Sequence, residues 1–317
     1  MTTTIRMPLV AQSPLWAIAR WVGVVLLVVL LAATTQWPTT TLNLLWNNVI
    51  PLLPAVFLIN PMIWRNVCPL ATLNELTGWR NERPALPTPA LLAFWAAGIT
   101  LLVVLVPARR FLFNEHTVPF AGTVLLVGAI AIGLGTLVSR RGGFCNTICP
   151  VLPVEKLYGQ SPLIAVGSAR CSDCNHCTTA GCIDLAGKKS ARQSVRGGHG
   201  LVWMLNPFGI FAAAFPGFVV GYYMTANTTL ANAPSVYLTV AAWTVGSLVL
   251  VAAIVALFRL ESMSVLPILG GVTFGLYYWF GAPTIATAYH LPAVGATVFR
   301  VAMLGLVAFW LRGALRR

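Results

Sequence analysis

Eight long apolar segments constrain the fold of this chain more than any other feature. About 20 apolar residues suffice for a helix to cross the hydrocarbon core of a bilayer. Only 9% of the 317 residues are charged, whereas a soluble domain has about 25%. The predicted spans are 15–34, 42–60, 89–107, 118–138, 201–223, 236–258, 264–282 and 292–311. We therefore expect an all-α polytopic membrane protein with about eight transmembrane helices in contact with membrane lipid.

The net charge of +13 is explained by where the basic residues lie. Membrane proteins concentrate Lys and Arg in their cytoplasmic loops. Here they gather between spans two and three, between spans four and five, and in the C-terminal tail, while Arg109 and Arg110 alone fall in opposite loops. This pattern predicts a multi-pass inner-membrane protein with both termini in the cytoplasm. Nucleic acid is not needed to explain the charge.

All seven cysteines lie in polar connecting segments between residues 68 and 182, on the predicted cytoplasmic side. Stable disulfides are rare in that reducing compartment, and an odd number of cysteines argues against a simple disulfide framework. The distribution therefore favours metal ligation.

The strongest motif is Cys171-x2-Cys174-x2-Cys177-x4-Cys182. Three cysteines at this spacing wrap a tight loop, as the ligands of a [4Fe–4S] cluster do. Zinc ribbons instead pair two knuckles separated by a longer stretch. The run departs from the bacterial ferredoxin pattern in its last gap of four residues and in having Ile183 where proline follows the final cysteine.

An internal repeat relates residues 66–78 to residues 147–159. Cys68, Pro69 and Gly78 match Cys149, Pro150 and Gly159, and Trp64 of the first copy matches Cys145 of the second. Proline suits a helix start and glycine a helix end. Each copy is expected to form a short amphipathic helix directly after a cysteine. The alternative is a helix-start repeat left by duplication, with no role for the thiol.

Two assignments of the seven thiolates are open. In the first, the four-cysteine run holds one cluster, and Cys68, Cys145 and Cys149 form a separate site. In the second, a Cys-Pro cysteine (Cys68 or Cys149) completes a cluster on Cys171, Cys174 and Cys177. Cys182 then joins Cys145 and the remaining Cys-Pro cysteine, because in two-cluster ferredoxins the fourth cysteine ligates the other cluster. One or two [4Fe–4S] clusters are therefore expected.

These motifs resemble those of the NapH/NosR/CcoG-type family of membrane-bound 4Fe–4S ferredoxins. The similar part is roughly residues 41–225, with Cys145, Cys149 and Pro150 as the intact C-x3-C-P motif and Cys68 and Pro69 as a partial one. The resemblance implies electron transfer between membrane quinols and other redox partners, or maturation of metal enzymes. This chain has one ferredoxin-like run where two are usual, and about four additional spans after it.

Two residues of the last predicted span are weaker candidates for cofactor binding. Arg300 would be costly in lipid, so it should face protein or water, where it could bind a quinone or a phosphate. A structural pair or snorkelling explains it equally well. Thr297 ends Val294-Gly295-Ala296-Thr297, which is similar to a motif that carries flavin on threonine, although small residues also serve helix packing.

The sequence predicts three parts: a four-helix membrane half (1–141), a small cytoplasmic iron–sulfur insertion (142–200) and a second four-helix half (201–317). The leading function is electron transfer between a membrane quinone or redox partner and a cytoplasmic carrier such as ferredoxin or flavodoxin, as a component of a quinol-linked oxidoreductase. The alternatives are an accessory or assembly subunit of a larger membrane redox complex, with a structural or redox-sensing cluster, and a copper reductase or maturation factor.

Overall fold

The computed structural model describes residues 14–76, 86–114, 116–138, 143–166, 187–195 and 198–316. Within these ranges the chain is helical, and its only strand-like feature is an isolated bridge between His199 and Glu261. The first helices are α1 (Pro14–Gln36), α2 (Pro38–Leu44), η1 (Leu45–Val49), α3 (Ile50–Ile59), α4 (Pro61–Val67), α5 (Pro69–Leu76), α6 (Thr88–Ala108), η2 (Arg109–Phe113) and α7 (Thr117–Leu137). Then follow α8 (Leu152–Tyr158), α9 (Gly187–Ser194), η3 (Gly200–Met204), α10 (Pro207–Tyr223), η4 (Leu230–Asn232), α11 (Ala233–Phe258), α12 (Ser262–Ala288) and α13 (Ala293–Arg316). The all-α prediction is confirmed for this part of the chain.

Seven helical stretches of the described chain are long and apolar enough to cross a membrane. They are Leu15–Gln36, Pro38–Ile59, Thr88–Phe113, Thr117–Leu137, Leu230–Phe258, Ser262–Ala288 and Val294–Arg316, and each overlaps a predicted span. Large apolar side chains are exposed along α1, α11 and α13, as expected for faces that contact lipid. These are the features of a polytopic membrane protein.

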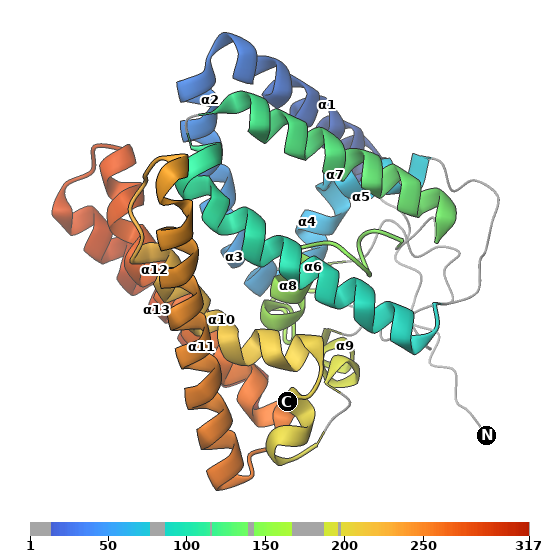
Figure 1. The fold of residues 1–317 in the computed structure, drawn as a ribbon, viewed down its shortest axis with the longest axis vertical. Coiled ribbons are helices and arrows are strands. Elements are labelled where there is room, and N and C mark those ends of the chain that lie inside the picture. The colour runs from blue at the N-terminus through green and yellow to red at the C-terminus, as the bar shows by residue number, and fades with distance from the viewer. Residues whose placement is uncertain are drawn as a thin grey trace.

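The predicted span 201–223 is not among these seven, which is a correction to the expected eight. Its first part forms the short 3₁₀-helix η3, and the Asn206 side chain then accepts a hydrogen bond from the Gly209 amide, so that α10 starts at Pro207. The remaining 17 residues are about 25 Å long, less than the thickness of a typical hydrocarbon core. Most of α10 is buried, packed against α11, α12 and α6 (Figure 1).

A proline lies beside each of the π-helical turns within two of the spans. Pro51 has no N–H to donate to the carbonyl of Asn47, and its ring crowds that carbonyl, so the preceding turn, η1, widens. Pro107 lies on the other side of its π-turn, two residues before η2. Such turns often mark functional sites, and η1 and η2 both line the large cavity described below.

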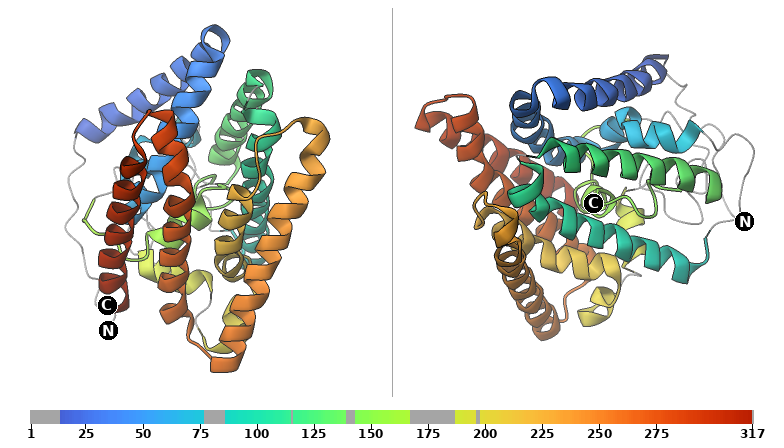
Figure 2. Two further views of the ribbon diagram at one scale, coloured as in Figure 1. Left: turned by 90° about the vertical axis from the view of Figure 1, so that its left-hand side faces the viewer. Right: turned by 45° about the horizontal axis from the view of Figure 1, so that its top comes forward.

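The predicted repeat corresponds to a reciprocal packing of two helical units. In the first unit, α5 follows Cys68 and packs against its own first span, α1, and against α7 of the second unit. In the second, α8 follows Cys149 and packs against its own first span, α6, and against α3 of the first unit. Figure 2 (right) shows α5 between α1 and α7. The short helix of each unit thus packs against the other unit, as expected if an approximate two-fold axis relates the two units.

One close backbone contact fixes the exchange of α5. A Cβ atom on Gly135 of α7 would overlap the carbonyl oxygen of Asn74 on α5. Only glycine permits helices to approach this closely at that point. Gly133 lies two residues earlier on the same helix, and a Cβ atom there would meet nothing within 4 Å.

We expect Gly135→Ala to lower the free energy of unfolding by about 1–3 kcal/mol, because the added methyl group overpacks the α5–α7 contact. The measurement is an SDS titration of the purified protein in mixed micelles, followed by tryptophan fluorescence. Gly133→Ala is the matched control and should change stability by less than about 0.5 kcal/mol. Equal stability of the two variants would contradict this account of the contact.

Candidate metal centre

The two Cys-Pro segments place their cysteines on ordered turns that lead into α5 and α8. Cys68 ends α4 with an extended backbone, and α5 begins at Pro69. Its amide donates to the Trp64 carbonyl (2.7 Å), and the Cys149 amide donates to the Phe144 carbonyl (3.1 Å). Cys68 is buried and Cys149 is half-buried. Cys68 therefore stands immediately before α5, and Cys149 stands three residues before α8.

Glycines in the first span of each unit hold these turns in equivalent places. A Cβ on Gly23 of α1 would overlap the carbonyl oxygen of Val67, and a Cβ on Gly98 of α6 would lie 2.8 Å from that of Ile148. Val67 and Ile148 directly precede Cys68 and Cys149. The same backbone contact therefore supports both Cys-Pro turns.

One turn before each glycine, the first span of each unit makes a second contact with a short helix. The two contacts occupy matching positions, but their chemistry differs. Arg20 of α1 forms an ion pair with Glu75 of α5 (2.9 Å). In the second unit, the Lys156 ammonium of α8 lies 3.7 Å from the centre of the Trp95 ring of α6. Arg20 and Trp95 each stand three residues before their glycine, and Glu75 matches Lys156 in the aligned repeat. The ion pair of one unit is thus a cation–π contact in the other.

Arg65 joins the two units from a buried position. One guanidinium nitrogen donates to Glu155 (2.9 Å) and the other to the Asn146 side chain (2.7 Å). Arg65 and Glu155 are only 5% and 2% exposed. Arg65 and Asn146 are equivalent residues of the repeat, 81 positions apart. Asn74, the counterpart of Glu155 in the first unit, also contacts the other unit. Its side chain accepts a hydrogen bond from the Phe144 amide (2.9 Å).

This junction joins the segments that carry the three described cysteines, because Arg65 lies three residues before Cys68 and Asn146 lies next to Cys145. Burial raises the pKa of the Cys149 thiol well above its ordinary value, and Glu155, Cys145 and Cys68 raise it further. A thiol is a metal ligand only as its thiolate, so metal binding at Cys149 would have to release a proton.

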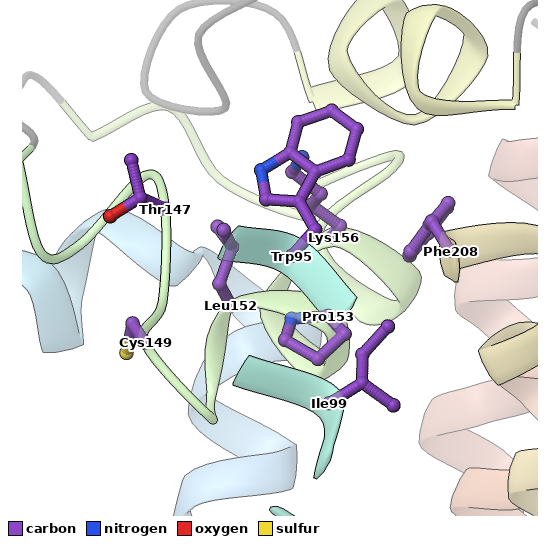
Figure 3. A pocket seen from close by; sticks show the side chains of 8 residues that line it. All are labelled: Trp95, Ile99, Thr147, Cys149, Leu152, Pro153, Lys156 and Phe208. Carbon is purple, nitrogen blue, oxygen red and sulfur yellow. The ribbon is translucent and has the colours of Figure 1, made fainter. Parts of the chain in front are cut away.

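A small cavity lies beside Cys149 (Figure 3). Its lining residues are Trp95, Ile99, Thr147, Cys149, Leu152, Pro153, Lys156 and Phe208. The Lys156 ammonium donates to the Ser194 hydroxyl (3.0 Å) and so ties α8 to α9. The volume of about 10 Å³ is room for a single water molecule. This cavity cannot hold a metal cluster.

The strongest predicted ligands, Cys171, Cys174, Cys177 and Cys182, lie outside the described residues. Among the residues that are described, no group of three or more His, Cys, Asp or Glu side chains is placed to hold a metal ion. The assignment of Cys68, Cys145 and Cys149 to a separate site, and the alternative with a shared Cys-Pro ligand, both stay predictions.

The two weaker candidates stand apart from the cysteines, on α13. Arg300 donates through Nε to the Trp279 carbonyl (2.8 Å), and its guanidinium lies 4.8 Å from the centre of the Trp279 ring. The Nε atom and the face of the guanidinium thus have partners on α12. Thr297 is exposed. No contact described for either residue points to a cofactor, and their roles stay predictions.

Sequence reasoning missed the residues that hold the junction together. The positive-inside pattern explains Arg65 and Lys156 as basic loop residues, and the repeat explains Glu155 only as a position in a short helix. The available signal was a carboxylate inside a short helix whose other residues, apart from Lys156, are mostly apolar, since a buried carboxylate demands a cationic partner. The sequence does not show that this partner lies in the other repeat.

No protein-family model, curated protein or solved structure matches the chain. The similarity to the NapH/NosR/CcoG-type family therefore rests on the cysteine motifs. A function must be argued from the residues themselves.

We expect Arg65→Met to lower the free energy of unfolding by about 3–5 kcal/mol, because it leaves the Glu155 carboxylate buried without its cation. The double variant Arg65→Met/Glu155→Leu should regain most of that stability, since it removes both charges. Both are measured by SDS titration as above. A double variant as unstable as the single one would show that packing, and not the ion pair, holds the junction.

Proposed function

We propose that this protein is a membrane-bound iron–sulfur electron-transfer protein of the NapH/NosR/CcoG type. Its cluster, or two clusters, would lie at the cytoplasmic membrane surface. Electrons would pass between a membrane quinone or a redox partner, such as a larger membrane complex, and a soluble carrier. The observation that carries the proposal is the ferredoxin-like run Cys171-x2-Cys174-x2-Cys177-x4-Cys182, whose spacing suits a [4Fe–4S] cluster.

The fold of the described residues supports this proposal in one respect. The hydrogen bond from Arg65 to Asn146 joins the segments of the two repeat units that carry Cys68 and Cys145. Seven thiols exceed the four that one cluster takes. A Cys-Pro cysteine therefore remains a candidate for a ligand shared with the run.

The second observation that favours electron transfer is the charge on α9. This helix follows the cysteine run, and Lys189 and Arg192 are exposed on it. Exposed basic side chains beside a redox centre attract an acidic carrier and speed its docking. A soluble ferredoxin or flavodoxin has the required charge.

We expect the anaerobically purified protein to contain about four iron and four sulfide ions per cluster, with an EPR signal after reduction by dithionite. Cys174→Ser should abolish the cluster, whereas Ser172→Ala, the control within the same run, should retain it. About eight iron ions per chain would indicate two clusters. Zinc without iron would contradict the proposal.

The same measurement on Cys68→Ser and Cys149→Ser separates the two ligand assignments. Loss of iron from the cluster of the run in either variant supports a shared Cys-Pro ligand. Full retention of iron in both variants would exclude a shared ligand. A stable cluster with no electron transfer to any carrier would favour the accessory-subunit alternative.

We expect Lys189→Glu/Arg192→Glu to slow electron exchange with an acidic soluble carrier about tenfold at low ionic strength, because it reverses the attractive charge of α9. Stopped-flow absorbance of the cluster measures the rate. Arg312→Glu/Arg316→Glu makes the same charge change on exposed residues of α13 and should leave the rate nearly unchanged. A wild-type rate that does not vary with salt would argue against docking on α9.

A further inference from the structure

A large cavity lies between the two repeat units and the C-terminal helices. Its volume is about 540 Å³, within the range of about 300–1,000 Å³ that is typical of small-molecule sites. Side chains of α3, α6, α7, α8, α10 and α12 line it, together with the π-turns η1 and η2. The cavity is mostly apolar, and its polar groups include the guanidinium groups of Arg109 and Arg110.

Within the described part of the chain, the groups that these two arginines contact are neutral. Arg109 donates to the Tyr222 hydroxyl (2.8 Å) and lies 4.8 Å from the centre of the Trp46 ring. Arg110 donates to the Asn227 side chain (3.1 Å) and to the Tyr222 carbonyl (2.9 Å), and lies 4.2 Å from the Tyr222 ring centre. The ion pairs found within the described chain, Arg20–Glu75 and Arg65–Glu155, involve neither of them.

Each arginine also has a donor without an acceptor among the described residues. The Nε atoms of Arg109 and Arg110 are buried, and no described group accepts a hydrogen bond from them. A buried donor without an acceptor is costly, and two adjacent guanidinium charges repel each other. Both residues belong to the apolar stretch Thr88–Phe113, where charge is expensive unless compensated. An anion between them would supply both the missing charge and the missing acceptors.

The rest of the cavity suits a hydrocarbon chain. Leu105 and Val106 of α6, Phe215 and Phe218 of α10, and Val151 beside α8 belong to its wall. A free inorganic anion would leave this apolar space unused. A quinone would fill it, but a neutral molecule would leave both guanidinium charges uncompensated.

We propose that this cavity binds an anionic lipid, with its head group on Arg109 and Arg110 and one acyl chain against the apolar wall. The head group supplies a phosphate or carboxylate, which arginine binds in a forked geometry. The lipid then completes the junction between the repeat units and α10 and α12. This inference does not depend on the iron–sulfur function.

Native mass spectrometry of the purified, delipidated protein in detergent tests the proposal, with dioleoyl phosphatidylglycerol as the probe. We expect Arg109→Gln/Arg110→Gln to weaken its binding at least about tenfold, given the strength of hydrogen bonds to charged groups. Arg312→Gln, an exposed arginine of α13, is the control and should bind as the wild type does. Dioleoyl phosphatidylethanolamine, which has no net charge, should bind more weakly than phosphatidylglycerol.

A second variant keeps the test decisive if the arginine variants fail to fold. Leu105→Trp fills the apolar part of the cavity and retains both arginines, so we expect it to weaken phosphatidylglycerol binding as well. Unchanged lipid binding in both the arginine pair and Leu105→Trp would overturn the proposal. So would equal binding of phosphatidylethanolamine, or of the neutral quinone decylubiquinone. Inorganic phosphate that binds as tightly as the lipid, and is unaffected by Leu105→Trp, would assign the site to a free anion instead.

Discussion

A buried guanidinium at the junction of two helical repeats governs how this protein is assembled. Arg65 cannot be buried without a counter-charge, because the desolvation of an unpaired ion costs several kcal/mol. Its carboxylate partner, Glu155, and its amide partner, Asn146, both come from the other repeat. The ion pair is therefore satisfied only when the two units are docked in register. The Cys-Pro turns, which lie directly beside these residues in the chain, take their relative positions from the same docking.

The two units keep their backbone contacts and differ in their side chains. Gly23 and Gly98 make the same approach to the residue before each cysteine. At the matching positions around this contact, an ion pair in the first unit is replaced by a cation–π contact in the second. Trp64 likewise stands where the second unit has Cys145. Backbone packing tolerates only glycine at the contact points. The neighbouring side chains differ between the two units, and the second unit has two of the three described cysteines.

Charges are scarce in this chain, and several of those within the described helices hold the fold together. Arg20 and Lys156 take part in contacts that fasten a short helix to a span, and Arg65 joins the short helices α4 and α8. Arg109 and Arg110 belong to the π-turn η2, and they line a cavity that the helical repeats share with α10 and α12. The wide turn presents two consecutive arginines toward the protein interior. The protein thus combines a thiol-rich junction with a separate cationic cavity.

The sequence by itself determined the helical membrane class, seven spans, the repeat and the inventory of thiols. Apolar length and motif spacing are local properties, and they can be read without knowing which helices touch. The tertiary structure alone decided that α10 is a buried helix, because its burial depends on packing against α11 and α12. It also decided that Arg65 pairs with Glu155, and that Arg109 and Arg110 face a cavity. Such partnerships join residues 90 or more positions apart, and no local pattern specifies them because they arise only when the helices pack.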